Sequence, residues 1–419
     1  MGIRPSHLAL AGLLAAPAAQ AIDYEFSGDL DVRGFGRTQA EGGYQNGFEQ
    51  RIRLRTDIAL DDGVSLHAGV NLINDTWRGD ASGDVSALAQ TQPFTWGRDH
   101  RTVTLDYGYV QVPLGDWTLR AGRQIANWNF GMTVGDDRRD RILLMRPAGE
   151  GVTFLMGGDQ RQKGTLDDNK DDGYLVFAGF VGKTSGWSWG ALLGHYMGDD
   201  ETLPDGTYER YRFYAPRDGT LVSPWAKGQL GAVEVTAGGH YLGGGDALFT
   251  NDTFGGFLRG GLEASEDLKL EAQYFFSLGG SLIETGFDTF SSLIHSNPRH
   301  NATATYMPAL SLSGLGKVSR EFQDDGVADQ DFDRHLVATR GTYRLSDDWS
   351  LKLAAGWVRY DGVAGDLDQE EDVTFGDLQM HYQVTPSTRV WATYGYADTA
   401  DLVARDSLNA FSVNLRTQF

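Results

Sequence analysis

The sequence predicts an all-β protein, a transmembrane antiparallel up-and-down β-barrel of about 18 strands, with short periplasmic turns and long extracellular loops. Three observations carry this prediction. The chain begins with a segment typical of a secretory signal peptide. Apolar and polar residues alternate along the rest of it, and the connections between the alternating segments are short and long in turn.

Composition excludes several classes of protein before any motif is considered. The 419 residues carry 36 Lys and Arg against 57 Asp and Glu, a formal net charge of −21. This charge argues against a nucleic-acid partner, because phosphate neutralisation needs clustered cations. The absence of cysteine excludes disulfides, thiolate metal sites and a cysteine nucleophile. A mean hydropathy of −0.35 argues against a helical membrane protein but allows a barrel, whose strands are apolar on one face only.

The N-terminus has the three parts of a signal peptide. A short basic start precedes the apolar run Leu8 to Ala16, and the small residues Ala19 and Ala21 flank Gln20. The apolar run is too short to span a bilayer, and the small-residue pair lies where a signal peptidase cleaves. We expect residues 1–21 to be a Sec signal peptide and residues 22–419 to form one barrel domain.

The last strand carries a second signal. Phe411, Val413, Leu415 and Phe419 share one face of the alternating C-terminal segment, and polar side chains share the other. A terminal alternating strand that ends in Phe resembles the insertion signal of bacterial outer-membrane barrels. This resemblance implies the outer membrane of a Gram-negative cell, with the barrel-assembly machinery, membrane lipid and lipopolysaccharide as partners.

The connections set the number of strands. Tight turns such as 61–63, 115–116 and 184–186 alternate with long polar stretches such as 76–101 and 281–300. Both termini of such a barrel lie on the periplasmic side, so the number of strands is even. Counts of roughly 16 to 20 fit a need for about 10 residues per spanning strand. Two weak hairpins, near 137–158 and 301–319, give 20 strands if both are strand pairs and 18 if one is only a loop, and the chain length favours 18.

Three arginines on one strand are the main candidate for a functional site. Arg51, Arg53 and Arg55 alternate with the apolar Ile52 and Leu54, and a charge on the lipid face costs about 2–4 kcal/mol, so we expect them to face the lumen. Alternation adds further pore-lining candidates, namely Arg33, Arg120, Arg340, Arg344, Arg416, Asp29, Asp31 and Asp57.

Two interpretations of these arginines remain open. A ladder of inward cations gives hydrated anions a graded path through a pore. The same arginines can instead pair with Asp29, Asp31, Glu49 and Asp57 and hold neighbouring strands together. On the first interpretation, replacing Arg51, Arg53 and Arg55 by Ser lowers anion preference without unfolding the barrel.

No enzyme, metal or cofactor motif stands out. The G-x-S-x-G and H-E-x-x-H patterns are absent, and histidines such as His67 and His381 are scattered singly. We therefore predict no catalytic residues, no resident metal and no cofactor. The acidic loops, for example 167–172, indicate a solvated rim, with a loop-bound Ca²⁺ or cation bridges to lipopolysaccharide as the sharper alternative.

Two segments resemble a known family. Leu119 to Gln124 is similar to the "LRxGRQ" strand of the alginate-export outer-membrane proteins, and Phe287 to Phe290 with His300 is loosely similar to their "FDxLYPxxHxYYG" segment. The resemblance implies an 18-stranded barrel with an arginine-lined pore for an anionic polysaccharide.

Three functions follow from the sequence. We expect a porin for passive diffusion of small hydrophilic and anionic solutes or oligosaccharides. Export of an alginate-type polysaccharide and a non-conducting barrel acting as a surface enzyme or adhesin are the alternatives.

Overall fold

Strands make up nearly all of the chain that the computed structural model describes. The described residues are 23–38, 44–76, 103–162, 173–198, 218–243, 252–278, 287–294, 333–361, 370–398 and 407–419. The strands are β1 (Asp23–Thr38), β2 (Tyr44–Ala59), β3 (Ser65–Thr76), β4 (Thr104–Leu114), β5 (Trp117–Trp128), β6 (Val134–Gly149), β7 (Val152–Gln162), β8 (Gly173–Thr184), β9 (Trp187–Gly198), β10 (Asp218–Leu230), β11 (Val233–Gly243), β12 (Thr253–Glu263), β13 (Leu268–Leu278), β14 (Asp333–Arg344), β15 (Trp349–Asp361), β16 (Glu370–Thr385), β17 (Thr388–Asp398) and β18 (Ser407–Gln418).

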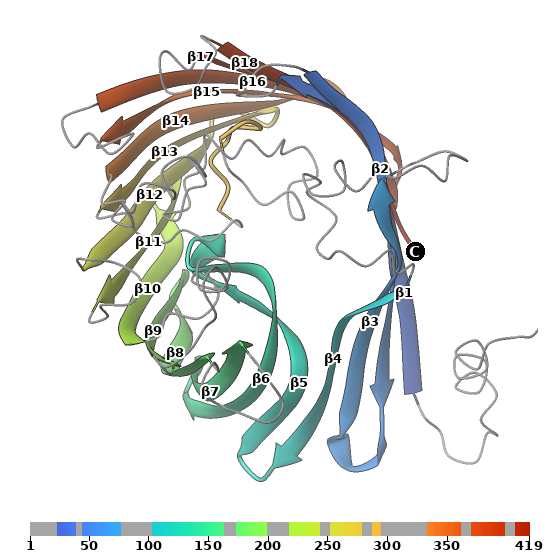
Figure 1. Cartoon of the computed structure of the whole chain (residues 1–419), viewed down its shortest axis with the longest axis vertical. Coiled ribbons are helices and arrows are strands. Elements are labelled where there is room, and N and C mark those ends of the chain that lie inside the picture. The colour runs from blue at the N-terminus through green and yellow to red at the C-terminus, as the bar shows by residue number, and fades with distance from the viewer. Residues whose placement is uncertain are drawn as a thin grey trace, which may run out of the picture.

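The sheet closes on itself. All 18 strands form one antiparallel sheet in which each strand pairs with its neighbours in sequence, and β1 pairs with both β2 and β18. The register at the closing seam places Asp31 opposite Arg416 and Val32 opposite Leu415. Figure 1 shows the strands arranged in a ring. The predicted antiparallel barrel and its count of 18 strands are therefore confirmed.

The predicted tight turns lie between consecutive strands. The tight turns predicted at 61–63, 115–116 and 184–186 each join consecutive strands at one end of the barrel, which we call the short-turn rim. The weak hairpin predicted near 137–158 is a strand pair, β6 with β7. The hairpin near 301–319, the signal peptide at 1–21 and the acidic loop at 167–172 lie outside the described residues.

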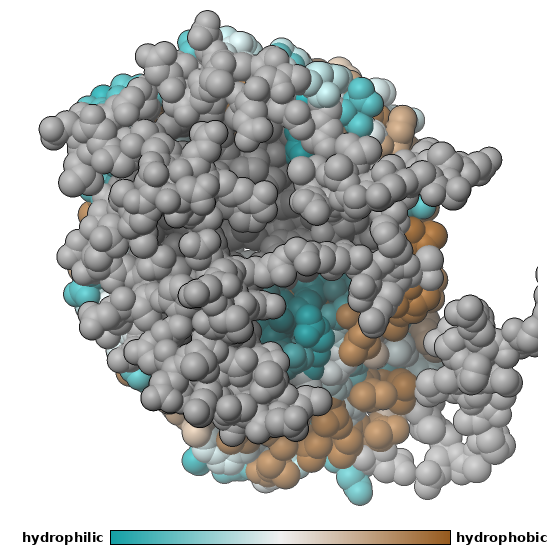
Figure 2. Space-filling view, viewed as in Figure 1, coloured by the Kyte–Doolittle hydropathy of each residue, from teal (hydrophilic) through white to brown (hydrophobic). Residues whose placement is uncertain are grey.

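The two faces of the wall differ as the alternation predicts. Phe411, Val413 and Leu415 point outward from β18 and are exposed, as are Tyr24 and Phe26 on β1. Figure 2 shows hydrophobic residues along the outer wall and hydrophilic residues in the visible part of the interior. Among the described residues, no helix is long and apolar enough to cross a membrane.

The end of the β5–β6 hairpin bends into the barrel. The paired part of β4 and β5 ends at Gly108 and Arg123, next to Gly122, whose φ of +125° few side chains tolerate. Beyond this point a short 3-10 turn, η2 (Asn129–Gly131), reaches the wall of β10 and β11, where Asn129 Nδ2 donates to Gly239 O at 3.0 Å. Figure 1 shows this turn inside the barrel. Part of the interior is therefore filled.

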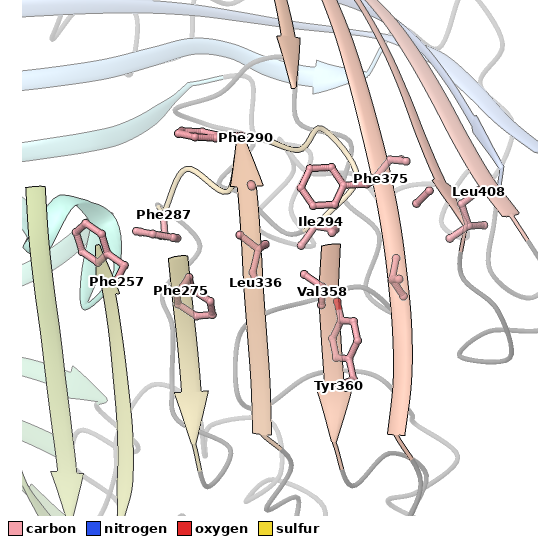
Figure 3. Packing of buried hydrophobic residues seen from close by; sticks show 14 of the residues in the cluster. Phe257, Phe275, Phe287, Phe290, Ile294, Leu336, Val358, Tyr360, Phe375 and Leu408 are labelled. Atoms are coloured by element: carbon pink, nitrogen blue, oxygen red, sulfur yellow. The ribbon is translucent and has the colours of Figure 1, made fainter. Parts of the chain in front are cut away.

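A second segment lies within the lumen. Residues 287–294, here called the luminal segment, belong to the connection between β13 and β14. Its buried Phe287, Phe290, Leu293 and Ile294 pack on inward apolar side chains of the wall. Figure 3 shows the wall side of this contact, with labelled residues Phe257, Phe275, Leu336, Val358 and Phe375. Burial of these side chains holds the segment against β12 to β16.

Candidate functional site

The predicted arginine ladder lies on the luminal face of β2, where it is ion-paired. Arg51 Nη2 is 2.5 Å from Asp31 Oδ2, and Arg53 Nε is 3.1 Å from Asp29 Oδ2. Arg55 also pairs with Asp29, so this buried carboxylate serves all three arginines, Arg51 being at 3.5 Å. Buried charges of this kind need partners, because desolvating an ion costs several kcal/mol.

A bulge supplies another partner that the alternation does not reveal. The register of β3 with β4 shifts between Gly69 and Val70, which leaves Asp106 as the extra residue on β4. Such bulges re-aim a side chain. Asp106 accepts from Arg53 Nη1 at 3.0 Å and from Arg138 Nε at 2.9 Å. The arginine ladder is thus joined to β6 through a carboxylate.

Other predicted residues are also paired or lie at the rim. Arg33 Nη2 is 2.5 Å from Glu49 Oε2, and Arg416 pairs with Asp31 across the closing seam. Arg344 lies at the short-turn rim, where its Nε is 2.8 Å from Asp267 Oδ1. The remaining predicted residues have these contacts: Arg120 Nε donates to Gln111 Oε1 at 2.7 Å, Asp57 pairs with His67, and Arg340 pairs with Glu271 and Asp288.

Two arginines of the wall hold the luminal segment through Asp288. Arg340 Nη1 lies 2.9 Å from Asp288 Oδ2, and Arg259 Nη2 donates to the Asp288 carbonyl oxygen at 2.7 Å. Partial burial raises the pKa of Asp288, but the charges of Arg340 and Arg259 outweigh it and hold that pKa below the ordinary value of 3.8. Asp288 is therefore a carboxylate at neutral pH and an internal counter-ion for both arginines.

A second contact latches the luminal segment to β16 and β17. Asp377 Oδ1 accepts the backbone N–H of Ser292 at 2.8 Å. Opposite Asp377 in the β16–β17 register lies Gly395, where an added Cβ would lie 2.1 Å from Ser292 Oγ. The wall needs a residue without a side chain at this position because the segment approaches so closely.

We expect Gly395→Leu to displace the luminal segment and increase single-channel conductance, because the new side chain takes the place of Ser292. The control is Gly376→Leu on β16, where the nearest atom to an added Cβ is 3.9 Å away. Single-channel recordings of both variants in planar bilayers test this. Equal conductance of Gly395→Leu and the unmodified chain would show that the segment does not narrow the path.

Two luminal cations differ from the ladder. Within the described part of the chain, Lys352 on β15 and Arg389 on β17 make no ion pair. The electrostatic neighbours of Lys352 are the cations Arg340 and Arg389 together with Asp288 and Glu271. Those of Arg389 are Arg416 and Asp31. We call the set Arg259, Arg340, Lys352, Arg389 and Arg416 the cationic row.

The cationic row contains an unfavourable pairing. Arg389 lies directly opposite Arg416 in the β17–β18 register, and like charges in this position destabilise a sheet by up to about 1 kcal/mol. Arg416 is compensated by Asp31, whereas the guanidinium of Arg389 lies 4.9 Å from the ring centroid of Trp391. An exposed, uncompensated cation at a luminal position is available to a mobile anion.

Lys352 and Arg389 were not among the residues predicted to line the pore, although the sequence carries a signal for both. Lys352 stands between the apolar Leu351 and Leu353, as an inward polar residue of an alternating strand does. Arg389 lies two residues before Trp391 and therefore shares its face of the strand. The ion-pair partners of the ladder are harder to predict from the sequence, because Asp106 is the extra residue of a β-bulge. No group of three or more His, Cys, Asp or Glu that could hold a metal ion occurs among the described residues.

Comparison with known proteins gives a likeness of fold. No family model and no curated protein matches the sequence. Among solved structures, OpdO of Pseudomonas aeruginosa is similar with a TM-score of 0.58 at 14% identity, covering 95% of this chain and 97% of its own. OccK10 (OpdN) of the same organism has a TM-score of 0.58 at 12% identity, covering 95% and 98%.

OprD, also of Pseudomonas aeruginosa, has a TM-score of 0.56 at 11% identity and covers 95% of each chain. The alginate-export resemblance of Leu119 to Gln124 and Phe287 to Phe290 receives no support from these matches. At such low identity the likeness concerns the fold alone. The chain shares its closed antiparallel barrel fold with these three Pseudomonas aeruginosa structures.

Proposed function

We propose that this protein is an outer-membrane channel for passive diffusion of small anionic solutes. The closed barrel with an apolar outer face fits a bilayer, and the similar Pseudomonas aeruginosa structures are outer-membrane porins. Residues 1–21 as a Sec signal peptide, assembly through the C-terminal strand and contact with lipopolysaccharide belong to the same proposal.

The cationic row sets the preference of the channel for anions. Lys352 and Arg389 are luminal and without ion pairs in the described part of the chain, and their electrostatic neighbours include other cations as well as carboxylates. Clustered uncompensated charge of one sign raises the local concentration of the opposite ion in a narrow passage. The ladder of Arg51, Arg53 and Arg55 contributes less because carboxylates neutralise it.

The filled interior limits the size of the solute. The η2 turn and the luminal segment both occupy the lumen, and the segment places Asp288 against two members of the cationic row. A small carboxylate or phosphate ester competes with Asp288 for Arg259 and Arg340 and passes from them to Lys352 and Arg389. Polymer export needs a wider passage, and the comparisons do not favour it or the surface enzyme or adhesin.

Efflux from proteoliposomes tests this function. Vesicles loaded with gluconate, sorbitol or N-methylglucamine contain six-carbon solutes of similar size that are anionic, neutral and cationic. We expect gluconate to leave fastest and N-methylglucamine slowest, with the difference shrinking at high salt because salt screens the row. Faster efflux of the cation, or no efflux from folded protein, contradicts the proposal.

A further inference from the structure

Three hydrogen-bonded side chains on the luminal face of β2 and β3 lie outside the cationic row. Ser65 Oγ lies 2.9 Å from His67 Nε2, and His67 Nδ1 contacts Asp57 Oδ1. The His67 imidazole therefore has Ser65 at one ring nitrogen and Asp57 at the other. This is the order of groups in a serine nucleophile, its general base and the carboxylate that orients the base.

The strand geometry produces this arrangement directly. Ser65 and His67 are two residues apart on β3 and therefore share the luminal face. Asp57 is the register partner of His67 on β2, so the two side chains meet across the strands. The carboxylate fixes the tautomer with the proton on Nδ1, which leaves Nε2 free to accept from the Ser65 hydroxyl.

The next strands place polar donors beside the serine. Gln111 on β4 is the register partner of Ser65, and Arg120 on β5 is the register partner of Gln111. Arg120 Nε donates to Gln111 Oε1 at 2.7 Å, which turns the amide nitrogen of Gln111 away from Arg120. Within the described residues, neither the Gln111 amide nitrogen nor the Arg120 charge has an acidic partner.

An aromatic ring packs against the base. Tyr109 stacks on His67 with 4.7 Å between ring centroids, and the guanidinium of Arg120 lies 5.6 Å from the centroid of Tyr109. Arg120 is thus held near the serine and histidine without touching either. A bound molecule with an anionic group can pair with Arg120 while its other end reaches Ser65.

The group is accessible from the short-turn rim. Ser65 directly follows the β2–β3 turn. The side chains of His67 and Asp57 are 22% and 50% exposed, whereas that of Arg51 is 7% exposed. A solute entering or leaving at this rim therefore passes within reach of Ser65.

We propose that Ser65, His67 and Asp57 form a hydrolytic site for small esters that carry an anionic group. Ser65 Oγ attacks the ester carbonyl carbon as His67 Nε2 takes the hydroxyl proton, and the Gln111 amide donates to the developing oxyanion. The C–O bond to the alcohol breaks, and His67 returns the proton to the leaving oxygen. Water, deprotonated by His67, then attacks the acyl–Ser65 ester and releases the carboxylic acid and the free serine.

Labelling with an alkyl fluorophosphonate tests the nucleophile. This probe bonds to an activated serine oxygen with loss of fluoride, and peptide mass spectrometry identifies the modified residue. We expect modification of Ser65 in the full chain and about 100-fold slower modification in His67→Gln. Ser350 is the internal control, because its register partner His381 contacts Gln379 and, among the residues that the structure describes, no carboxylate. Equal modification of Ser65 and Ser350, or an unchanged rate in His67→Gln, overturns the proposal.

Ester hydrolysis tests the remaining roles. Refolded protein should release p-nitrophenol from p-nitrophenyl acetate and faster from the anionic p-nitrophenyl hemisuccinate, with both activities lost in Ser65→Ala. Asp57 is a positioning residue, so Asp57→Asn should lose activity and Asp57→Glu should retain part of it. Arg120→Gln should slow the anionic ester more than the neutral one, because Arg120 pairs with the anionic group and also orients the Gln111 amide.

A folded barrel runs with a different mobility before and after heating in detergent, which verifies each variant independently of activity. Hydrolysis that persists in folded Ser65→Ala overturns the proposal. Equal loss of activity in Asp57→Asn and Asp57→Glu would show that Asp57 does not position His67.

Discussion

The triple variant Arg51→Ser, Arg53→Ser, Arg55→Ser is expected to lose several kcal/mol of stability as well as anion preference. Asp29 is 2% exposed and Asp31 is 5% exposed, and both depend on these arginines. Removing one partner of a buried ion pair costs about 3–5 kcal/mol, because an uncompensated charge stays behind. The sequence alone led us to expect no unfolding, and the shared carboxylate changes that expectation.

A compensated variant separates the two effects. Adding Asp29→Asn to the triple variant removes the carboxylate that pairs with all three arginines, whereas Asp31 and Asp106 keep their ion pairs with Arg416 and Arg138. We expect this variant to recover much of the stability in urea unfolding and part of the anion preference. If the triple variant is as stable as the unmodified chain, the ladder is not a structural ion-pair network.

The second large effect concerns the cationic row. We expect Lys352→Gln with Arg389→Gln to lower the chloride-to-potassium permeability ratio by about five-fold per charge, since a unit charge at about 4 Å in water contributes about 1 kcal/mol. Stability should stay equal or rise slightly, because Arg389 no longer opposes Arg416. The measurement is the reversal potential together with urea unfolding of the same preparation.

The control for this variant removes the same charge elsewhere. Lys227 pairs with Glu234 at 3.0 Å and Arg146 with Asp116 at 3.6 Å, outside the cationic row. Lys227→Gln with Arg146→Gln should change the permeability ratio far less. Equal changes in the two double variants would mean that net charge, and not the position of Lys352 and Arg389, sets selectivity.

The alternation of apolar and polar residues was enough to predict which side chains of the barrel wall face inward and which face outward. It places Arg51, Arg53 and Arg55 inside and Phe411 and Val413 outside, because each strand has one lipid-facing side. It failed at Asp106, where an extra residue breaks the alternation. It also gave no warning of the ion-pair partners, since these depend on the register between strands.

The same alternation could not predict that a segment of the chain packs inside the lumen. Leu336 and Val358 are apolar and face inward, while Val337 and Trp357 beside them are apolar and face outward, so hydrophobicity does not distinguish the faces. The inward pair is buried only because the luminal segment covers it. The contact of Asp57 with His67 likewise needs the β2–β3 register, which the sequence does not state.

Anion selectivity is best measured as the reversal potential of the purified protein in a planar bilayer under a potassium chloride gradient. Because Lys352 and Arg389 make no ion pair within the described residues, we expect stable conductance steps and a reversal potential whose sign shows that chloride is the more permeant ion. A reversal potential of the opposite sign would show that carboxylates govern the passage and would contradict the role of the cationic row.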